Sequence, residues 1–117
     1  MKHLSYADKT LFVDDATADA LVEYAGLLAA EQSGDTVTVR AIGGDGNEVE
    51  ASFVLNMGTN LVAESTTADV GAPTNPTEVA YMLERIGLIR NPPQAQPFED
   101  EAERMLDDAR MEEWNSD

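Results

Sequence analysis

The chain has 117 residues, 43% of them hydrophobic, and this length suits one domain with a modest core. It contains no cysteine, which excludes disulfides, thiolate metal ligands and cysteine nucleophiles. Its net charge of −16, with 23 acidic against seven basic residues, disfavours direct binding to nucleic acids or anionic membranes, because both need Lys and Arg.

The N-terminal residues predict a short hairpin rather than a targeting segment. Leu4 and Tyr6 alternate with polar residues, residues 7–10 form a polar turn, and residues 11–13 are β-type. No apolar run follows Lys2, so we expect no signal peptide, and no apolar stretch approaches the length of a membrane span. A cytoplasmic protein is the prediction.

The pattern over residues 16–32 predicts the first helix. Apolar side chains recur at helical spacing, and Asp14 or Asp15 can cap the first turn. Gly34, with Ser33 before it, is expected to end the helix because glycine tolerates a left-handed conformation. The apolar stripe consists of Leu21, Tyr24, Ala25 and Leu28, with Ala18 and Val22 on adjoining positions.

Residues 36–42 and 48–55 predict a β-hairpin with a loop at 43–47. If Ile42 pairs with Glu48, then Val39 faces Ala51 and Val37 faces Phe53, so apolar residues meet on one face. On the other face Arg40 lies opposite Glu50, and Thr38 opposite Ser52. A shift by one residue would oppose apolar and polar side chains, so this register is predicted.

The rest of the chain predicts one more strand and two helices. Residues 61–63 are expected to form a third strand that continues the hairpin of 36–42 and 48–55 as a meander. A second helix is expected to begin with Asn75 as its cap and Pro76 in its first turn, and to end at Gly87. Its buried stripe is predicted to be Val79, Leu83 and Ile86. Residues 91–97 form a proline-rich linker, and residues 98–117 an acidic amphipathic helix.

The predicted fold class is therefore α+β, with a mostly antiparallel sheet of about five short strands in the order β-β-α-β-β-β-α, followed by the C-terminal helix. Residues 1–90 form the predicted domain. The first helix is expected to cover one face of the sheet.

The polar residues offer no recognised catalytic motif. His3 is the only histidine, at a terminus expected to be mobile, and we interpret it as a surface residue. The loop at 43–48 is interpreted as a turn rather than a phosphate or calcium loop, since it joins two strands. Of the carboxylate pairs, Asp14 and Asp15 have a capping role, and Glu48 and Glu50 can pair with Arg40. No catalytic residue, metal site or cofactor is predicted.

The C-terminal segment is the predicted contact surface. Residues 99–117 carry nine acidic residues and two arginines, a net of −7. The anchors expected to contact a protein partner are Phe98, Met105, Leu106, Met111 and Trp114. The same stripe could instead pack on its own domain or on a second copy of the chain.

Three functions are compatible with these features. The first is a non-catalytic protein-interaction or regulatory module that offers an acidic surface. The second is a small enzyme or ligand-binding domain, with a pocket flanked by residues such as Tyr6, Tyr24, Tyr81 or Arg85. The third is an acidic mimic of a nucleic acid, which would need carboxylates spaced like phosphates. The first is the preferred hypothesis.

Overall fold

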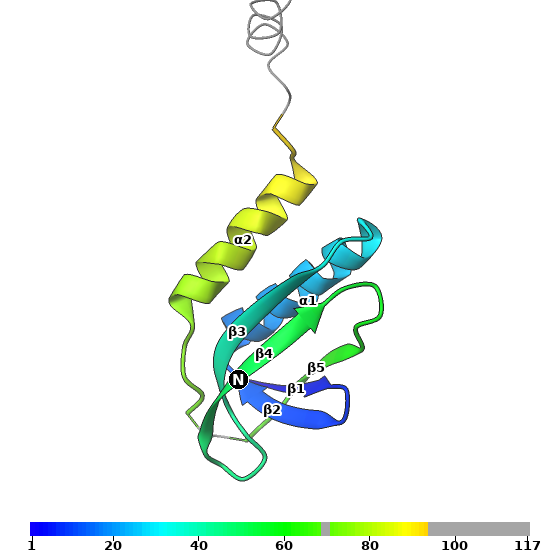
Figure 1. Cartoon of the computed structure of the whole chain (residues 1–117). Coiled ribbons are helices and arrows are strands. Elements are labelled where there is room, and N and C mark those ends of the chain that lie inside the picture. The colour runs from blue at the N-terminus through cyan, green and yellow to red at the C-terminus, as the bar shows by residue number, and fades with distance from the viewer. Residues whose placement is uncertain (69–70, 94–117) are drawn as a thin grey trace, which may run out of the picture.

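The computed structural model describes residues 1–68 and 71–93, which form one antiparallel sheet with two helices on one side (Figure 1). The fold is α+β, as predicted. In chain order its elements are β1 (Lys2–Tyr6), β2 (Lys9–Val13), α1 (Asp15–Ala30), β3 (Asp35–Ile42), β4 (Glu48–Leu55), β5 (Leu61–Ser65) and α2 (Pro76–Arg90).

The five strands lie in the order β4-β3-β2-β1-β5, so the sheet is not a simple meander. The N-terminal hairpin of β1 and β2 is confirmed, with Tyr6 paired to Lys9 across a two-residue turn. The predicted strand at 61–63 exists, but its predicted pairing with β4 is wrong. β5 instead pairs with β1, where Leu61 and Ala63 pack half-buried against the core beside Tyr6 and Leu4.

The β3–β4 hairpin has the predicted register. Ile42 pairs with Glu48, Val39 with Ala51 and Val37 with Phe53. Val37, Val39, Phe53 and Leu55 are all buried, because alternate residues of both strands face the helices. In the loop, the amide of Gly43 donates to the carbonyl of Asn47 at 2.8 Å and Gly46 has φ +88°, so the interpretation as a turn is confirmed.

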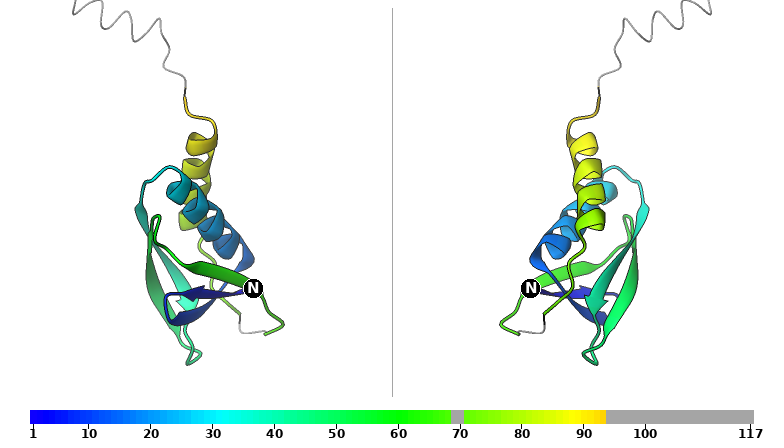
Figure 2. Two further views of the ribbon diagram at one scale, coloured as in Figure 1. Left: turned by 90° about the vertical axis from the view of Figure 1, so that its right-hand side faces the viewer. Right: turned by 90° about the vertical axis from the view of Figure 1, so that its left-hand side faces the viewer.

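Helix α1 lies along the concave face of the sheet and contacts β1, β4 and β5 (Figure 2). Its predicted apolar stripe is buried, as is Ala18, whereas Val22 on the other adjoining position is 40% exposed. Asp14 caps the first turn, as expected. The end differs, because Gln32 rather than Gly34 adopts the left-handed conformation, with φ +54°, and the amide of Ser33 donates to the carbonyl of Leu28.

Helix α2 packs beside α1, and its buried stripe differs from the predicted one (Figure 2). Ile86 is buried, as predicted, and Val79 is half-buried against the core. Leu83 was predicted to be buried but is 53% exposed, and Met82 is buried instead. α2 contacts α1 and, to a smaller extent, β3 along a narrow strip of its surface. Such a strip buries positions three and four residues apart, and Leu83 lies outside it. The helix also continues through Gly87 to Arg90, since a glycine costs an exposed helix only about 1 kcal/mol.

The sheet is sharply curled. β2 and β3 are paired only at Phe12 and Ile42, and beyond this pair the two hairpins diverge. In a flat sheet β1 and β4 would lie about 14 Å apart, three strand spacings. Instead the hydroxyl of Tyr6 on β1 reaches the backbone of Val54 on β4, so the two hairpins enclose a concave face.

Most of the predicted C-terminal segment lies outside the described residues. Asn91, Pro92 and Pro93 follow α2 without further helix or strand, and the rest of the predicted linker at 91–97 and the helix at 98–117 stay predictions. The division of the chain into a domain, a linker and a helix also stays a prediction.

Candidate functional site

A cleft of about 420 Å³ opens on the concave face between the N-terminal hairpin and β4. Its floor is apolar, because the alternate residues of β2 and β4 that face the core line it, and polar residues form its rim. The lining residues are Tyr6, Lys9, Leu11, Val49, Glu50, Ala51, Ser52 and Phe53. Leu11, Val49 and Ala51 are half-buried, which leaves part of the apolar floor accessible.

Strand β4 borders the cleft with an open edge. β4 pairs only with β3, and no other strand of the described residues lies beyond it. The amide and carbonyl of Val54 point away from β3, since both bind the hydroxyl of Tyr6 at 3.1 and 2.9 Å. Backbone groups alternate along a strand, so those of Ser52 and Glu50 point to the same open edge as those of Val54.

The hydroxyl of Tyr6 closes one end of this edge. It satisfies both backbone groups of Val54, and its ring packs edge-on against Phe53 with the centroids 5.0 Å apart. The carbonyl of Val54 also accepts from the Thr59 hydroxyl at 2.9 Å. A second hollow of about 290 Å³ lies on the other side of Tyr6, beside Asn56 and Gly58.

The charges around the edge are balanced in number, with two carboxylates and two cations, but one carboxylate has no ion pair in the described part of the chain. Arg40 on β3 turns its guanidinium to Glu48 at 3.2 Å and to the carbonyl of Thr74 at 3.1 Å. It therefore does not neutralise Glu50, which lies opposite it in the ladder and has no ion pair within the described residues. Both glutamates are exposed on the convex face of β4. Lys9 supplies the cation on the opposite rim of the cleft.

A second polar cluster joins α1, α2 and β3. Tyr24 and Tyr81 both donate from their hydroxyls to Oδ2 of Asp35, each at 2.5 Å, and their rings meet edge-on at 6.3 Å. Burial would raise the pKa of Asp35, but the two tyrosine hydroxyls and the amide of Thr36 lower it below its usual value. Burial, together with the bond to Asp35, raises the pKa of Tyr24.

The geometry of this tyrosine cluster indicates a structural role, since it connects α1 and α2 to β3. Tyr24 is fully buried, and its hydroxyl is oriented to the carboxylate rather than toward an open surface. Of the four residues proposed to flank a ligand pocket, Tyr24 and Tyr81 meet here, and Arg85 lies near enough to lower the pKa of Asp35. None of these three residues lines the clefts beside Tyr6.

His3 lies in the sheet, not at a mobile terminus. It occupies β1, paired with Phe12 on one side and Glu64 on the other. Its ring stacks 5.3 Å from that of Phe12, and its Nδ1 lies 3.2 Å from Oε1 of Glu64. The expectation of terminal mobility is therefore wrong, because the first strand is an interior strand of the sheet. Its side chain is 31% exposed, and no metal-ligating residue besides Glu64 contacts it in the described part of the chain.

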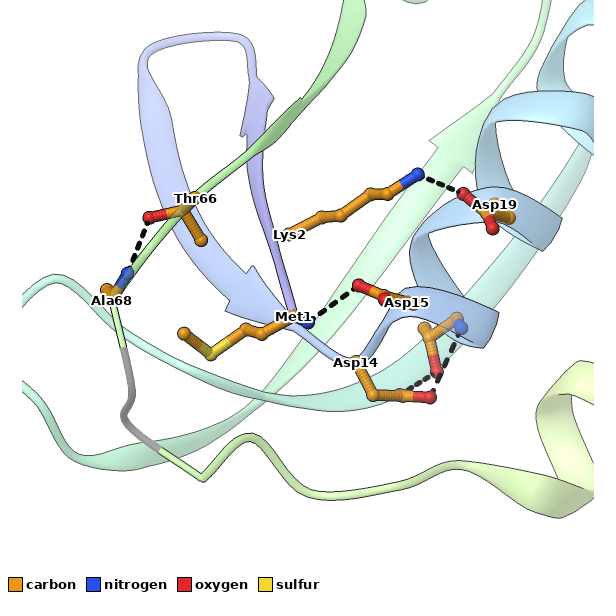
Figure 3. A network of polar contacts seen from close by, with 8 residues as sticks. Met1, Lys2, Asp14, Asp15, Asp19, Thr66 and Ala68 are labelled. Atoms are coloured by element: carbon orange, nitrogen blue, oxygen red, sulfur yellow. Dashed lines mark hydrogen bonds and ion pairs between the residues drawn. The ribbon is translucent and has the colours of Figure 1, made fainter.

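The acidic residues at the start of α1 have structural partners (Figure 3). Asp14 accepts from the backbone amide of Thr17 at 3.4 Å and from its hydroxyl. Asp15 pairs with the amino group of Met1 at 2.6 Å, and Asp19 with Lys2 at 2.6 Å. Residues 1–68 and 71–93 contain no cluster of three or more side chains that could hold a metal ion.

The partner-binding residues predicted from sequence lie outside the described residues. Phe98, Met105, Leu106, Met111 and Trp114 therefore keep their role as a prediction. Sequence reasoning also missed the cleft, because its two walls are 40 residues apart in the chain and depend on the curl of the sheet. One signal was available: Glu48 and Glu50 alternate on the outer face of a strand, a pattern typical of edge strands.

Comparisons with protein-family models, with curated proteins and with solved structures found no match to this chain. No helix among residues 1–68 and 71–93 is both long enough and apolar enough to cross a membrane.

Proposed function

We propose that this protein is a non-catalytic interaction module that binds a basic partner protein through its acidic surface. The observation that carries the proposal is the distribution of charge. The chain has a net charge of −16, of which residues 99–117 contribute −7 and residues 1–98 the remaining −9. The acidic character is therefore not confined to residues 99–117.

Ion pairs neutralise only a few of the carboxylates on this acidic surface. Lys2, Arg40 and Arg90 are each engaged by a carboxylate, at distances of 2.6 to 3.2 Å. Carboxylates outnumber these cations several-fold, so their fields add over the surface. Such a field attracts a basic partner and raises its association rate, and the attraction decreases with salt.

The C-terminal segment is the second element of the proposal. Its anchors, Phe98 and Trp114 among them, alternate with acidic residues, which suits a groove with an apolar floor and a basic rim. With seven basic against 23 acidic residues, the chain is not expected to bind nucleic acids or anionic membranes directly, and we expect it in the cytoplasm.

A small-ligand function is the alternative. The cleft of about 420 Å³ is within the size range of small-molecule sites, and Tyr6, one of the residues proposed to flank such a pocket, lines it. The tyrosine cluster supports this alternative less, because Asp35 already accepts three hydrogen bonds there. A fragment screen by NMR tests this alternative, which is supported if fragments bind only at this cleft. The Tyr6→Phe variant serves as the control, since loss of the hydroxyl should change the binding of fragments at this cleft.

The test of the proposed function is capture from the native lysate with the immobilised full chain. We expect a basic protein to be retained at low salt and released at about 1 M salt, where the screening length falls to about 3 Å. A chain with Phe98→Ala and Trp114→Ala shows whether the C-terminal anchors contribute. Retention of no protein, or of an acidic protein regardless of salt, would contradict the proposal.

A further inference from the structure

Strand β4 has an open edge beside an apolar cleft, and this combination suits the addition of a strand. We propose that the edge of β4 from Glu48 to Ser52 receives an extended segment of the basic partner, in which basic side chains alternate with small apolar ones. The inference rests on the proposed function and specifies the partner's chemistry.

The backbone of β4 supplies the hydrogen bonds for this addition. The amides and carbonyls of Glu48, Glu50 and Ser52 point away from β3, on the edge that Val54 also faces. Tyr6 already binds the groups of Val54, so it marks the limit of the open stretch. Main-chain bonds to such an edge give affinity, and pockets for alternate side chains give specificity.

The cleft receives the inward-facing side chains of the added strand. An added strand lies about 4.8 Å from β4, over the space between β4 and β2. Every second side chain would then contact Val49, Ala51 and Leu11, which are only half-buried in this structure. The volume of about 420 Å³ suits small apolar side chains such as valine or alanine.

The outward-facing side chains are selected by charge. On the convex face the added strand lies beside Glu50, which has no ion pair among the described residues, and beside Glu48, which Arg40 already pairs. Opposite charges in neighbouring strands are favourable, so a basic side chain is expected next to Glu50. A second copy of this chain would instead place its own glutamates there, a repulsive arrangement. The chain's residues 99–117, with nine acidic residues, would meet the same repulsion.

The test uses the isotope-labelled full chain and a capped peptide of three Lys-Val repeats, followed by NMR. We expect shifts at residues 48–53 and at Leu11, with slower amide exchange at Glu50 and Ser52. A peptide with Glu in place of Lys, and one with N-methylated backbone on the edge-facing side, should each bind about tenfold more weakly or worse, a difference of about 1.4 kcal/mol.

Two substitutions of one residue give the matched variants. Ser52→Pro removes the amide that faces the open edge and should abolish peptide binding. An edge strand tolerates proline at such a position, because the lost amide has no partner among the described strands of the sheet. Ser52→Ala removes only the hydroxyl that meets Thr38 at 2.7 Å and should bind like the parent chain. Equal binding by both variants, or equal binding of the N-methylated peptide, would overturn strand addition.

Other occupants of the edge give different results. Shifts at residues 48–53 that depend on protein concentration without peptide would show a second copy, and shifts caused by Trp114→Ala would show the chain's own C-terminal segment. Either result would overturn the proposal. If the peptide does not bind, but the full chain retains a partner from the lysate in a salt-sensitive way, strand addition is refuted and the proposed function is still supported.

Discussion

The side-chain amide of Asn75 binds both backbone groups of Arg40, as a neighbouring strand would. Its Oδ1 accepts from the Arg40 amide at 2.7 Å, and its Nδ2 donates to the Arg40 carbonyl at 3.0 Å and to the hydroxyl of Thr17 at 3.2 Å. Asn75 is 3% exposed, and Thr17 is fully buried. One side chain therefore completes the ladder of β3 where β2 has diverged, and connects the start of α2 to α1.

Asn75→Ala should lower the free energy of unfolding by about 2 to 4 kcal/mol, because it leaves the amide and carbonyl of Arg40 unsatisfied. Urea denaturation measures the change. Asn60→Ala, at an exposed amide, is the control and should change stability by less than about 0.5 kcal/mol. Similar losses in the two variants would show that Asn75 has no special role.

Tyr6→Phe should lower the free energy of unfolding by about 1 to 2 kcal/mol, because the ring remains while both bonds to the Val54 backbone are lost. Hydrogen exchange should also accelerate at the Val54 amide but not at Val39, which lies within the β3–β4 ladder. Unchanged exchange at Val54 would contradict the role of Tyr6 in holding the curl.

Asp35 should contribute to the acid stability of the fold. Its pKa is lowered in the folded state, so its contribution is present above the unfolded pKa of about 3.9 and is lost as the pH falls through the lower folded value. Asp35→Asn should reduce stability at pH 7 and flatten its decrease below about pH 4.

The matched control for Asp35 is Asp45→Asn in the exposed hairpin loop. The Asp45 carboxylate also has a lowered pKa, because it accepts from the amide and side chain of Asn47. Because it is exposed, its effect on acid unfolding should be smaller. Acid titration followed by circular dichroism compares the two variants. If the stability of Asp35→Asn decreased more steeply below about pH 4 than that of the parent chain, Asp35 would not contribute to acid stability in the predicted direction.

Gln32→Gly should raise the free energy of unfolding by about 0.5 to 1 kcal/mol. Gln32 has φ +54°, a conformation that costs an L-residue about 1 kcal/mol and glycine almost nothing. Gln32→Ala keeps a Cβ in the same conformation and should give no such gain. Thermal unfolding of the three proteins measures the differences, and an equal gain from both substitutions would exclude backbone strain as the cause.

Met82→Ala and Leu83→Ala separate the observed buried stripe of α2 from the predicted one. Met82 is fully buried, so its truncation should cost about 2 to 4 kcal/mol, whereas truncation of Leu83, 53% exposed, should cost less than about 1 kcal/mol. Denaturant unfolding of both variants measures the costs. A larger cost at Leu83 would mean that α2 packs with a different face.

The sequence by itself determined the elements of the described residues, two hairpin pairings and the register of one of them. Period-two alternation in residues 36–42 and 48–55 was sufficient for the register of β3 and β4, because only one alignment matched apolar with apolar and polar with polar. The first helix was also predictable, since its capping residue and its apolar spacing agree. These are local signals, and each depends on residues close in the chain.

Only the tertiary structure decided how these elements meet. From its sequence β5 could pair with either β4 or β1, because its apolar residues fit both positions. In the structure β5 pairs with β1, and the curl of the sheet places Tyr6 against Val54 at the edge of β4. Asn75 was predicted as a helix cap and occupies that position, but its side chain binds Arg40 instead. The cleft and its edge depend on contacts between residues about 40 positions apart, whose geometry no local pattern encodes.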